Sequence, residues 1–253
     1  MADDQPLREV GHLETRCEDC SFYTLCFAQD LSEEERKQLN LLLRRRQPVE
    51  RNEHLFHGGQ SLKSVTVIRS GSVKAYQVSQ EGDEIVSGFY LPGEIIGLDA
   101  LASGAHPGSA MALEDSRTCE IPLKDFVRML QDSPRLNSVI LNLLSEEMAE
   151  TRELLLIVGR LDARTRVALF LLSMSRRLAR RSQDPDQFRL TMDRRDIANY
   201  LGLTIETVSR TLSAMQRENV IEVRGKLVHI LDRERLNEQA GQGIREERQR
   251  AAG

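Results

Sequence analysis

The chain has 253 residues, of which 40% are hydrophobic and 29% are charged, so it is long enough to bury a sizeable core and to divide into two domains. No apolar run reaches the roughly 20 residues that cross a bilayer, and the N-terminal stretch has neither the basic start nor the apolar segment of a signal peptide. We therefore expect a cytoplasmic protein with no membrane partner, in which cysteines stay reduced.

The formal net charge of -4 conceals an asymmetry along the chain. Residues 1–159 carry about 16 Lys and Arg against about 26 Asp and Glu, whereas residues 160–235 carry about 16 against about 10. An acidic first part joined to a basic second part is typical of a sensor coupled to a nucleic-acid-binding module.

Three of the four cysteines, Cys17, Cys20 and Cys26, lie in the short stretch RCEDCSFYTLC, and Cys119 follows much later. In a reducing compartment this clustering indicates a metal site or reactive thiols. Four thiolates suit a [4Fe-4S] cluster or tetrahedral zinc, and the spacing does not separate the two. A regulatory disulfide between Cys17 and Cys20 would leave two thiols unexplained. No His or Asp constellation accompanies the cysteines, so we do not expect an enzyme.

Residues 51–123 read as short alternating segments between turn signals such as Gly58-Gly59 and Pro92-Gly93. This pattern predicts an all-β barrel or roll, because no helical pattern intervenes as a βαβ domain would require. We place the β-roll at residues 31–130, after an N-terminal cysteine segment at residues 1–30.

The period becomes helical from Asp125, and one long helix is predicted at residues 131–161. Counting heptads gives a predicted pairing seam, as dimerisation with a second copy would require. The apolar seam residues are Ile140, Leu143, Leu154, Ile157 and Leu161. Glu147 and Glu150 fall on the same seam positions, where two chains would bring carboxylates together, although both could instead point sideways to solvent.

Residues 162–236 contain RRDIANYLGLTIETVSRTLSAMQREN, which reads as a helix, a turn at Gly202 and a second helix capped by Thr204. One face of the second helix is apolar and is expected to be buried: Ile205, Val208, Leu212 and Met215. The opposite face is polar and carries Glu206, Ser209, Arg210 and Ser213.

Such a helix fits the DNA major groove, where Arg210 can donate to guanine, Glu206 can accept from a cytosine amine and Ser209 can contact a base or a phosphate. VIEVRGKLVHI reads as a β-hairpin wing. The residues expected at phosphates are Thr204, Ser213, Arg194, Arg195, Arg217, Arg224 and Lys226. Residues 237–253 are polar and are expected to form a flexible tail.

Together these motifs resemble the CRP/FNR superfamily of bacterial transcription regulators over roughly residues 17–236, and LTMDRRDIANYLGLTIETVSR is similar to the FNR branch. The resemblance implies an α+β fold with a cyclic-nucleotide-binding-like β-roll, a long dimerisation helix and a C-terminal winged helix-turn-helix. It also implies a homodimer on symmetric TTGAT-type sites, with Glu206, Ser209 and Arg210 reading bases.

The cysteine pattern resembles that of FNR, which implies one [4Fe-4S] cluster per subunit held by Cys17, Cys20, Cys26 and Cys119 and DNA binding that oxygen abolishes. The alternative is a zinc- or thiol-based redox-responsive regulator of the same fold. Haem, known in relatives, would need a ligand such as His54, His57 or His106, although a lone loop histidine is usually solvated. Ser21 and Leu25 match positions that resemble those tuning oxygen reactivity.

Three further expectations follow from the resemblance. Leu98 and Gly108 stand where cyclic-nucleotide-binding members have Glu and Arg, so we expect no cyclic nucleotide. Thr151 replaces an acidic residue that controls dimerisation in FNR, which leaves open whether the monomer–dimer switch is retained. The turn VSQEGDE matches a surface that contacts RNA polymerase, which implicates Val78, Ser79, Gly82 and Asp83, although it also fits an ordinary hairpin tip.

Overall fold

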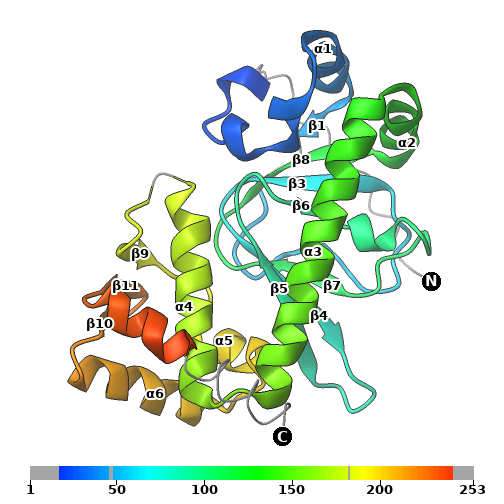
Figure 1. Ribbon diagram of the computed structural model, residues 1–253. Coiled ribbons are helices and arrows are strands. Elements are labelled where there is room, and N and C mark those ends of the chain that lie inside the picture. Colours follow the sequence, from blue (N-terminus) through cyan, green and yellow to red (C-terminus); the bar gives the residue numbers. More distant parts are fainter. Residues whose placement is uncertain (1–16, 46–47, 182, 242–253) are drawn as a thin grey trace, which may run out of the picture. The chain divides into compact units, whose positions relative to one another are not determined.

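The computed structural model describes residues 17–45, 48–181 and 183–241 (Figure 1). Residues 1–16 of the predicted cysteine segment and residues 242–253 of the predicted tail lie outside this range. The chain forms two compact units, residues 1–145 and residues 146–253. No helix in the described part is both long enough and apolar enough to cross a membrane.

Two four-stranded antiparallel sheets form the β-roll of the first unit, with strand orders β1-β8-β3-β6 and β2-β7-β4-β5. The strands are β1 Arg44–Arg45, β2 His54–Phe56, β3 Ser64–Ser70, β4 Val73–Val78, β5 Glu84–Tyr90, β6 Ile95–Ile96, β7 Ser109–Ala112 and β8 Arg117–Pro122. Predicted turn residues such as Gly59 and Gly93 have positive φ values and lie in the loops between these strands. The predicted β-roll is therefore confirmed.

The central strand β3 is covered on both faces. Val65 and Val67 belong to a core that also contains helical residues such as Phe126, whereas Ile68 belongs to a second core that includes Val73 of the other sheet. Alternate side chains of a strand point to opposite faces, so a strand between two cores needs apolar residues on both. This explains the nearly continuous burial of SVTVIRS.

Short helices surround the first sheet. They are the 3-10 helices Cys17–Asp19, Tyr23–Leu25, Phe27–Asp30 and Leu98–Ala100, and the α-helices α1 Glu33–Leu42 and α2 Leu123–Asp132. Ser32 and Glu35 form a capping box at the start of α1, since each side chain accepts a hydrogen bond from the other's backbone amide. Phe27 and Leu31 are buried in the same core as Val67 and hold the N-terminal segment against the roll.

The long helix α3 spans Pro134–Arg160 and begins where proline is tolerated, in the first turn. The Ser133 side chain accepts a hydrogen bond from the Leu136 amide at 2.9 Å. Two predicted seam residues are buried within the chain itself: Ile140 packs into the roll core, and Leu161 is also buried. Neither side chain is accessible to a partner helix, so the predicted seam requires correction.

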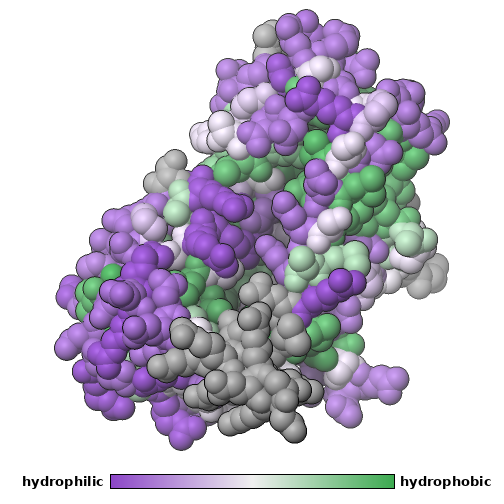
Figure 2. Space-filling view, in the orientation of Figure 1, coloured by the Kyte–Doolittle hydropathy of each residue, from purple (hydrophilic) through white to green (hydrophobic). Residues whose placement is uncertain are grey.

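The exposed apolar residues of α3 follow a different phase. Leu141, Met148 and Leu155 lie seven residues apart, and 57%, 56% and 68% of their surfaces are exposed. Figure 2 shows hydrophobic residues gathered beside part of α3. This exposed stripe is shifted by one residue from the predicted heptad seam, because the face of α3 that carries Ile140 is buried in the roll core. Thr151, three residues after Met148, is also exposed.

The second unit combines helices with a small sheet of order β10-β11-β9. Its elements are α4 Ala163–Ala179, β9 Gln187–Arg189, α5 Arg194–Tyr200, α6 Ile205–Arg217, β10 Ile221–Arg224 and β11 Leu227–Ile230, and a further helix follows at residues 233–241. The predicted wing is present, since Arg224 pairs with Leu227 across the turn at Gly225. β9 is the third strand of the sheet, and three residues are too few to show a period in the sequence.

Candidate cluster site and nucleic-acid interface

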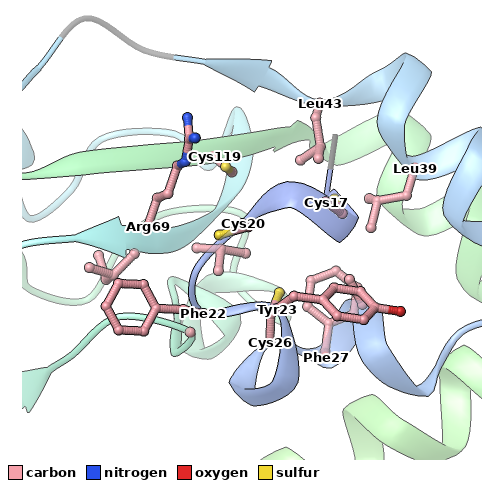
Figure 3. A pocket seen from close by; sticks show the side chains of 14 residues that line it. Cys17, Cys20, Phe22, Tyr23, Cys26, Phe27, Leu39, Leu43, Arg69 and Cys119 are labelled. Carbon is pink, nitrogen blue, oxygen red and sulfur yellow. The ribbon is translucent and has the colours of Figure 1, made fainter. Parts of the chain in front are cut away.

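All four cysteines line one pocket of the first unit (Figure 3). Cys17, Cys20 and Cys26 come from the consecutive turns before α1, and Cys119 comes from β8. None of the four cysteines is in a disulfide, all four are half-buried, and the pocket encloses about 40 Å³. Segments far apart in the sequence thus bring their sulfur atoms to a common cavity.

Tight turns hold the three N-terminal cysteines on a short arc. The Cys20 amide donates to the Cys17 carbonyl at 3.1 Å, and the Cys26 amide donates to the Tyr23 carbonyl at 3.1 Å. The Cys17 amide donates to the Asn40 side-chain oxygen of α1 at 2.9 Å. These bonds satisfy backbone groups that a loop of irregular shape would otherwise leave to solvent.

Gly93, in the turn before β6, allows the cysteine segment to approach the roll. Its φ is +91°, and a Cβ at this position would lie 2.9 Å from the Leu25 Cβ and 3.0 Å from the Leu25 carbonyl oxygen. Any larger residue would therefore collide with the Leu25 Cβ and crowd the Leu25 carbonyl group. Sequence reasoning identified Leu25 but missed Gly93, whose turn signal indicated only a loop.

The pocket disfavours an uncompensated thiolate. The pKa of the Cys26 thiol is raised to about 12, mainly by burial and also by the three other cysteines, while a hydrogen bond with the Ala28 backbone opposes this shift. Aromatic and aliphatic side chains, among them Phe22 and Leu39, form much of the wall. Burial among such side chains disfavours charged thiolates, and a bound metal or iron–sulfur core would compensate their charge.

The four cysteines come from different segments that border the same cavity. Within the described ranges, no three side chains of His, Cys, Asp or Glu are placed to hold a single metal ion. Tetrahedral zinc draws all its sulfur ligands to within about 2.3 Å of one ion. A four-iron cluster also takes four thiolates but presents several irons to them. The donor set of four cysteines fits either group.

The three histidines considered as haem ligands lie elsewhere in the roll. Nε2 of His54 is 2.8 Å from the Tyr76 hydroxyl, and the His57 ring lies 4.2 Å from that of His54. His106 is stacked on Phe56 at 3.6 Å between ring centroids. Among the described residues that line the cysteine pocket, none is one of these three histidines.

Gly108, which stands where cyclic-nucleotide-binding members have an arginine, has no free space for a side chain. A Cβ at Gly108 would lie 2.6 Å from the Tyr76 carbonyl oxygen, so no side chain fits there without movement of β4. Leu98 is buried in the core between the first sheet and the helices. At these two described positions the chain offers neither the arginine nor the glutamate of cyclic-nucleotide-binding members.

The helix-turn-helix is built by local capping. Asp193 and Asp196 form a capping box at α5, and Thr204 caps α6 by accepting from the Thr207 amide at 3.2 Å. Gly202 has φ +60° in the turn, and a Cβ there would lie 2.8 Å from Val158 Cγ1. The cap at Thr204 and the break at Gly202 match the prediction, whereas the cap at Asp193 was missed.

The two faces of α6 separate as expected with one exception. Val208, Leu212 and Met215 are buried. Ile205, predicted to be buried, is 40% exposed because it lies in the first turn, beyond the edge of the core. The predicted DNA-reading residues are exposed together: Glu206, Ser209, Arg210 and Ser213.

The predicted phosphate contacts differ in how available they are. Arg195 and Arg217 are exposed. Arg224 is exposed, but its Nη2 lies 2.7 Å from the Glu222 Oε1. The Lys226 ammonium group donates a hydrogen bond to the Thr191 carbonyl. Arg194 is half-buried, and this burial lowers the pKa of its guanidinium.

The hairpin between β4 and β5 carries the predicted polymerase-contacting residues. The Ser79 side chain accepts hydrogen bonds from the Glu81 and Asp83 amides, both at 3.2 Å, and orders the turn. Val78, Gly82 and Asp83 are exposed at the tip. A Cβ at Gly82 would have nothing within 4 Å.

Family models match both units. A Crp-like helix-turn-helix domain matches residues 165–239, and a cyclic nucleotide-binding domain matches residues 46–133. The chain is 40% identical to the fumarate and nitrate reduction regulatory protein of Escherichia coli K12 over 233 residues, 92% of this chain and 93% of that protein. The protein of the same name from Vibrio cholerae is 39% identical over the same shares.

Solved structures agree with this assignment. FixK2 from Bradyrhizobium japonicum has a TM-score of 0.71 at 27% identity, covering 76% of this chain and 95% of that one. TTHA1359, a transcriptional regulator of the CRP/FNR family from Thermus thermophilus, has a TM-score of 0.61 at 21% identity, covering 77% and 97%, and shows the fold alone. The chain therefore belongs to the CRP/FNR family of DNA-binding transcription regulators, on its FNR branch, and it is not an enzyme.

Proposed function

We propose that this chain is an oxygen-responsive regulator, active without oxygen, that binds symmetric TTGAT-type DNA sites as a homodimer in the cytoplasm. One [4Fe-4S] cluster per subunit would be held by Cys17, Cys20, Cys26 and Cys119. The observation that carries this proposal is the convergence of all four thiols, from two distant parts of the chain, on one pocket.

Four cysteines suit a [4Fe-4S] cluster as well as zinc, and membership of the FNR branch favours the cluster. When bound, the cluster would supply sensitivity to oxygen. The chain's own part is to hold the segment containing Cys17–Cys26 against β8, with Phe27 and Leu31 buried beneath it.

Each predicted range would have its own role. Residues 1–30 would bind the cluster, residues 31–130 would form the β-roll, residues 131–161 would dimerise, residues 162–236 would bind DNA and residues 237–253 would form a tail. Glu206, Ser209 and Arg210 would read base edges, because they share the exposed face at the start of α6. Phosphates would be contacted by Thr204, Ser213, Arg194, Arg195, Arg217, Arg224 and Lys226.

The dimer seam that we now propose consists of the exposed stripe Leu141, Met148 and Leu155 together with Thr151. With the stripe at heptad position a, Thr151 falls at d, inside the seam. Glu147 then flanks the seam, and Glu150 points away from it. Of the residues predicted for this role, Leu143, Leu154 and Ile157 remain half-buried on the neighbouring face.

The ordered hairpin tip would contact RNA polymerase through Val78, Ser79, Gly82 and Asp83, since the tip is exposed and its turn is rigidly hydrogen-bonded. No cyclic nucleotide would act as effector. The closed position at Gly108 supports this, because a buried phosphate without an arginine is costly.

The proposal is tested by purifying the chain without oxygen and measuring its visible absorption, iron, sulfide and zinc, then repeating after exposure to air with gel-shift binding to a TTGAT site. A brown protein with about 4 iron and about 4 sulfide per chain, which bleaches and loses DNA binding in air, is the expected result. A colourless zinc protein that still binds DNA in air would leave DNA recognition standing and overturn oxygen sensing.

A further inference from the structure

Arg69 brings a positive charge to the cysteine pocket. Of the described residues that line the pocket beside the four cysteines, Arg69 alone has a side chain that is charged at neutral pH. The residue is half-buried. In Figure 3 its side chain rises from β3 toward the strand that carries Cys119.

The pairing of β3 with β8 is irregular at Arg69. The register with β8 shifts between Ile68 and Ser70, so β3 has one more residue here than its partner, and that residue is Arg69. A bulge bends the strand and re-aims the side chain of the extra residue. Val67, two residues earlier, pairs with Cys119 and belongs with it to the core beneath the cysteine segment.

The charge has a physical use in this pocket. Four thiolates on a four-iron core of charge +2 leave a net charge of about -2, and burial of that charge among apolar side chains is unfavourable. A guanidinium keeps its proton and is weakly hydrated, so it can lie at the edge of an apolar pocket and still act as a cation.

We propose that Arg69 is a positioning residue whose guanidinium stabilises the negative charge of the four thiolates when the cluster is bound. This inference rests on the proposed function. A nearby cation favours whichever state carries more negative charge. Arg69 therefore raises the reduction potential of the bound cluster and slows the loss of iron from the thiolates.

The test compares Arg69→Met, Arg69→Lys and Arg117→Met with the unchanged full-length chain, all purified and loaded without oxygen. Arg117 is the matched control, because it is exposed on the adjacent strand β8 and does not line the pocket. Two quantities are measured: the midpoint potential in a titration with dithionite, and the rate of iron transfer to a chelator. Thermal unfolding of the iron-free variants checks their folding.

Arg69→Met is expected to shift the midpoint to a more negative potential and to release iron about tenfold faster, as loss of one charge-assisted contact implies. Arg69→Lys should recover most of both values, and Arg117→Met should match the unchanged chain. Equal potentials for Arg69→Met and the unchanged chain, or equal shifts in Arg69→Met and Arg117→Met, would overturn the role of Arg69. An unchanged chain without iron would overturn the proposed function, and this inference with it.

Discussion

At the residue scale, Gly93 shows how one missing side chain can place a whole segment. The Leu25 Cβ lies within the space that a Cβ of residue 93 would need, and the left-handed φ of the turn also favours glycine. The cysteine segment therefore approaches the roll as closely as it does because residue 93 has no side chain.

Gly93→Ala is expected to weaken cluster retention severalfold and to destabilise the fold by about 1–3 kcal/mol, through the collision and the strained φ together. Gly59→Ala is the matched control, because Gly59 has a φ of +81° with nothing within 4 Å of its Cβ position. Anaerobic iron content and thermal unfolding measure the two effects. Equal behaviour of the two variants would show that the contact with Leu25 is unimportant.

Arg210→Ala is expected to reduce binding to the preferred site by about 1–3 kcal/mol and to relax specificity at one base position, because a bidentate contact with guanine would be lost. Arg195, also exposed, is the comparison, since Arg195→Ala would remove a proposed phosphate contact. That variant should weaken binding to all sequences alike and lower the salt slope by about 1. Binding isotherms on sites with single base changes distinguish the two patterns.

At the element scale, α3 presents two apolar faces with different partners. One face, which carries Ile140, is buried in the roll core, and the other, which carries the Leu141, Met148 and Leu155 stripe, is exposed. Exposed large apolar residues at heptad spacing are typical of a helix that pairs with another helix.

Met148→Glu is expected to shift the anaerobic protein toward the monomer in sedimentation experiments, because it places a carboxylate at the centre of the stripe on both chains. The stability of the monomer should change by no more than about 0.5 kcal/mol, since the side chain is exposed. Ala149→Glu introduces the same charge at the next exposed position, outside the stripe, and should leave dimerisation intact. If both variants dimerise normally, the proposed seam is incorrect.

Gly82→Ala is expected to abolish activation at a promoter while leaving operator binding unchanged. The hairpin tip has open space at this position, so the substitution alters the turn, whose φ is +91°, without disturbing the roll. Transcription assays and gel shifts on the same promoter separate the two activities. Weakened DNA binding would contradict a role in contacting polymerase.

At the scale of the whole molecule, the cysteine pocket and the DNA-binding helix lie in different units, with α3 running through the boundary between residues 145 and 146. A signal at the cysteines can change DNA affinity only by favouring one state of the chain over another. Dimerisation is the state change for which the exposed stripe provides a surface.

Removal of iron with a chelator is expected to lower the dimer fraction and to reduce DNA affinity at least tenfold, since two half-sites are then bound separately. The same treatment of Met148→Glu should change DNA affinity little, because dimerisation has already been lost. Sedimentation and gel shifts with both proteins measure this coupling. If removal of iron still strongly lowers the DNA affinity of Met148→Glu, the coupling between iron binding and DNA binding does not depend on the dimer seam.

Features that depend on close neighbours in the chain could be predicted from the sequence. The cap at Thr204, the break at Gly202 and the polar face of α6 follow from contacts within one or two turns. The alternating segments of the roll and the family of the chain were recognised for the same reason: strand period, turn residues and helix faces are local patterns.

Tertiary structure decided the features that depend on distant neighbours. Periodicity leaves the phase of α3 uncertain by a residue, and only packing of Ile140 into the roll core directs Leu141 and Met148 outward. Arg69 lines the cysteine pocket at a shift in the register between β3 and β8, and the need for Gly93 depends on where Leu25 docks. Contacts between segments far apart in sequence leave no local period, so the sequence by itself determined the elements, whereas the fold determined which of their faces meet.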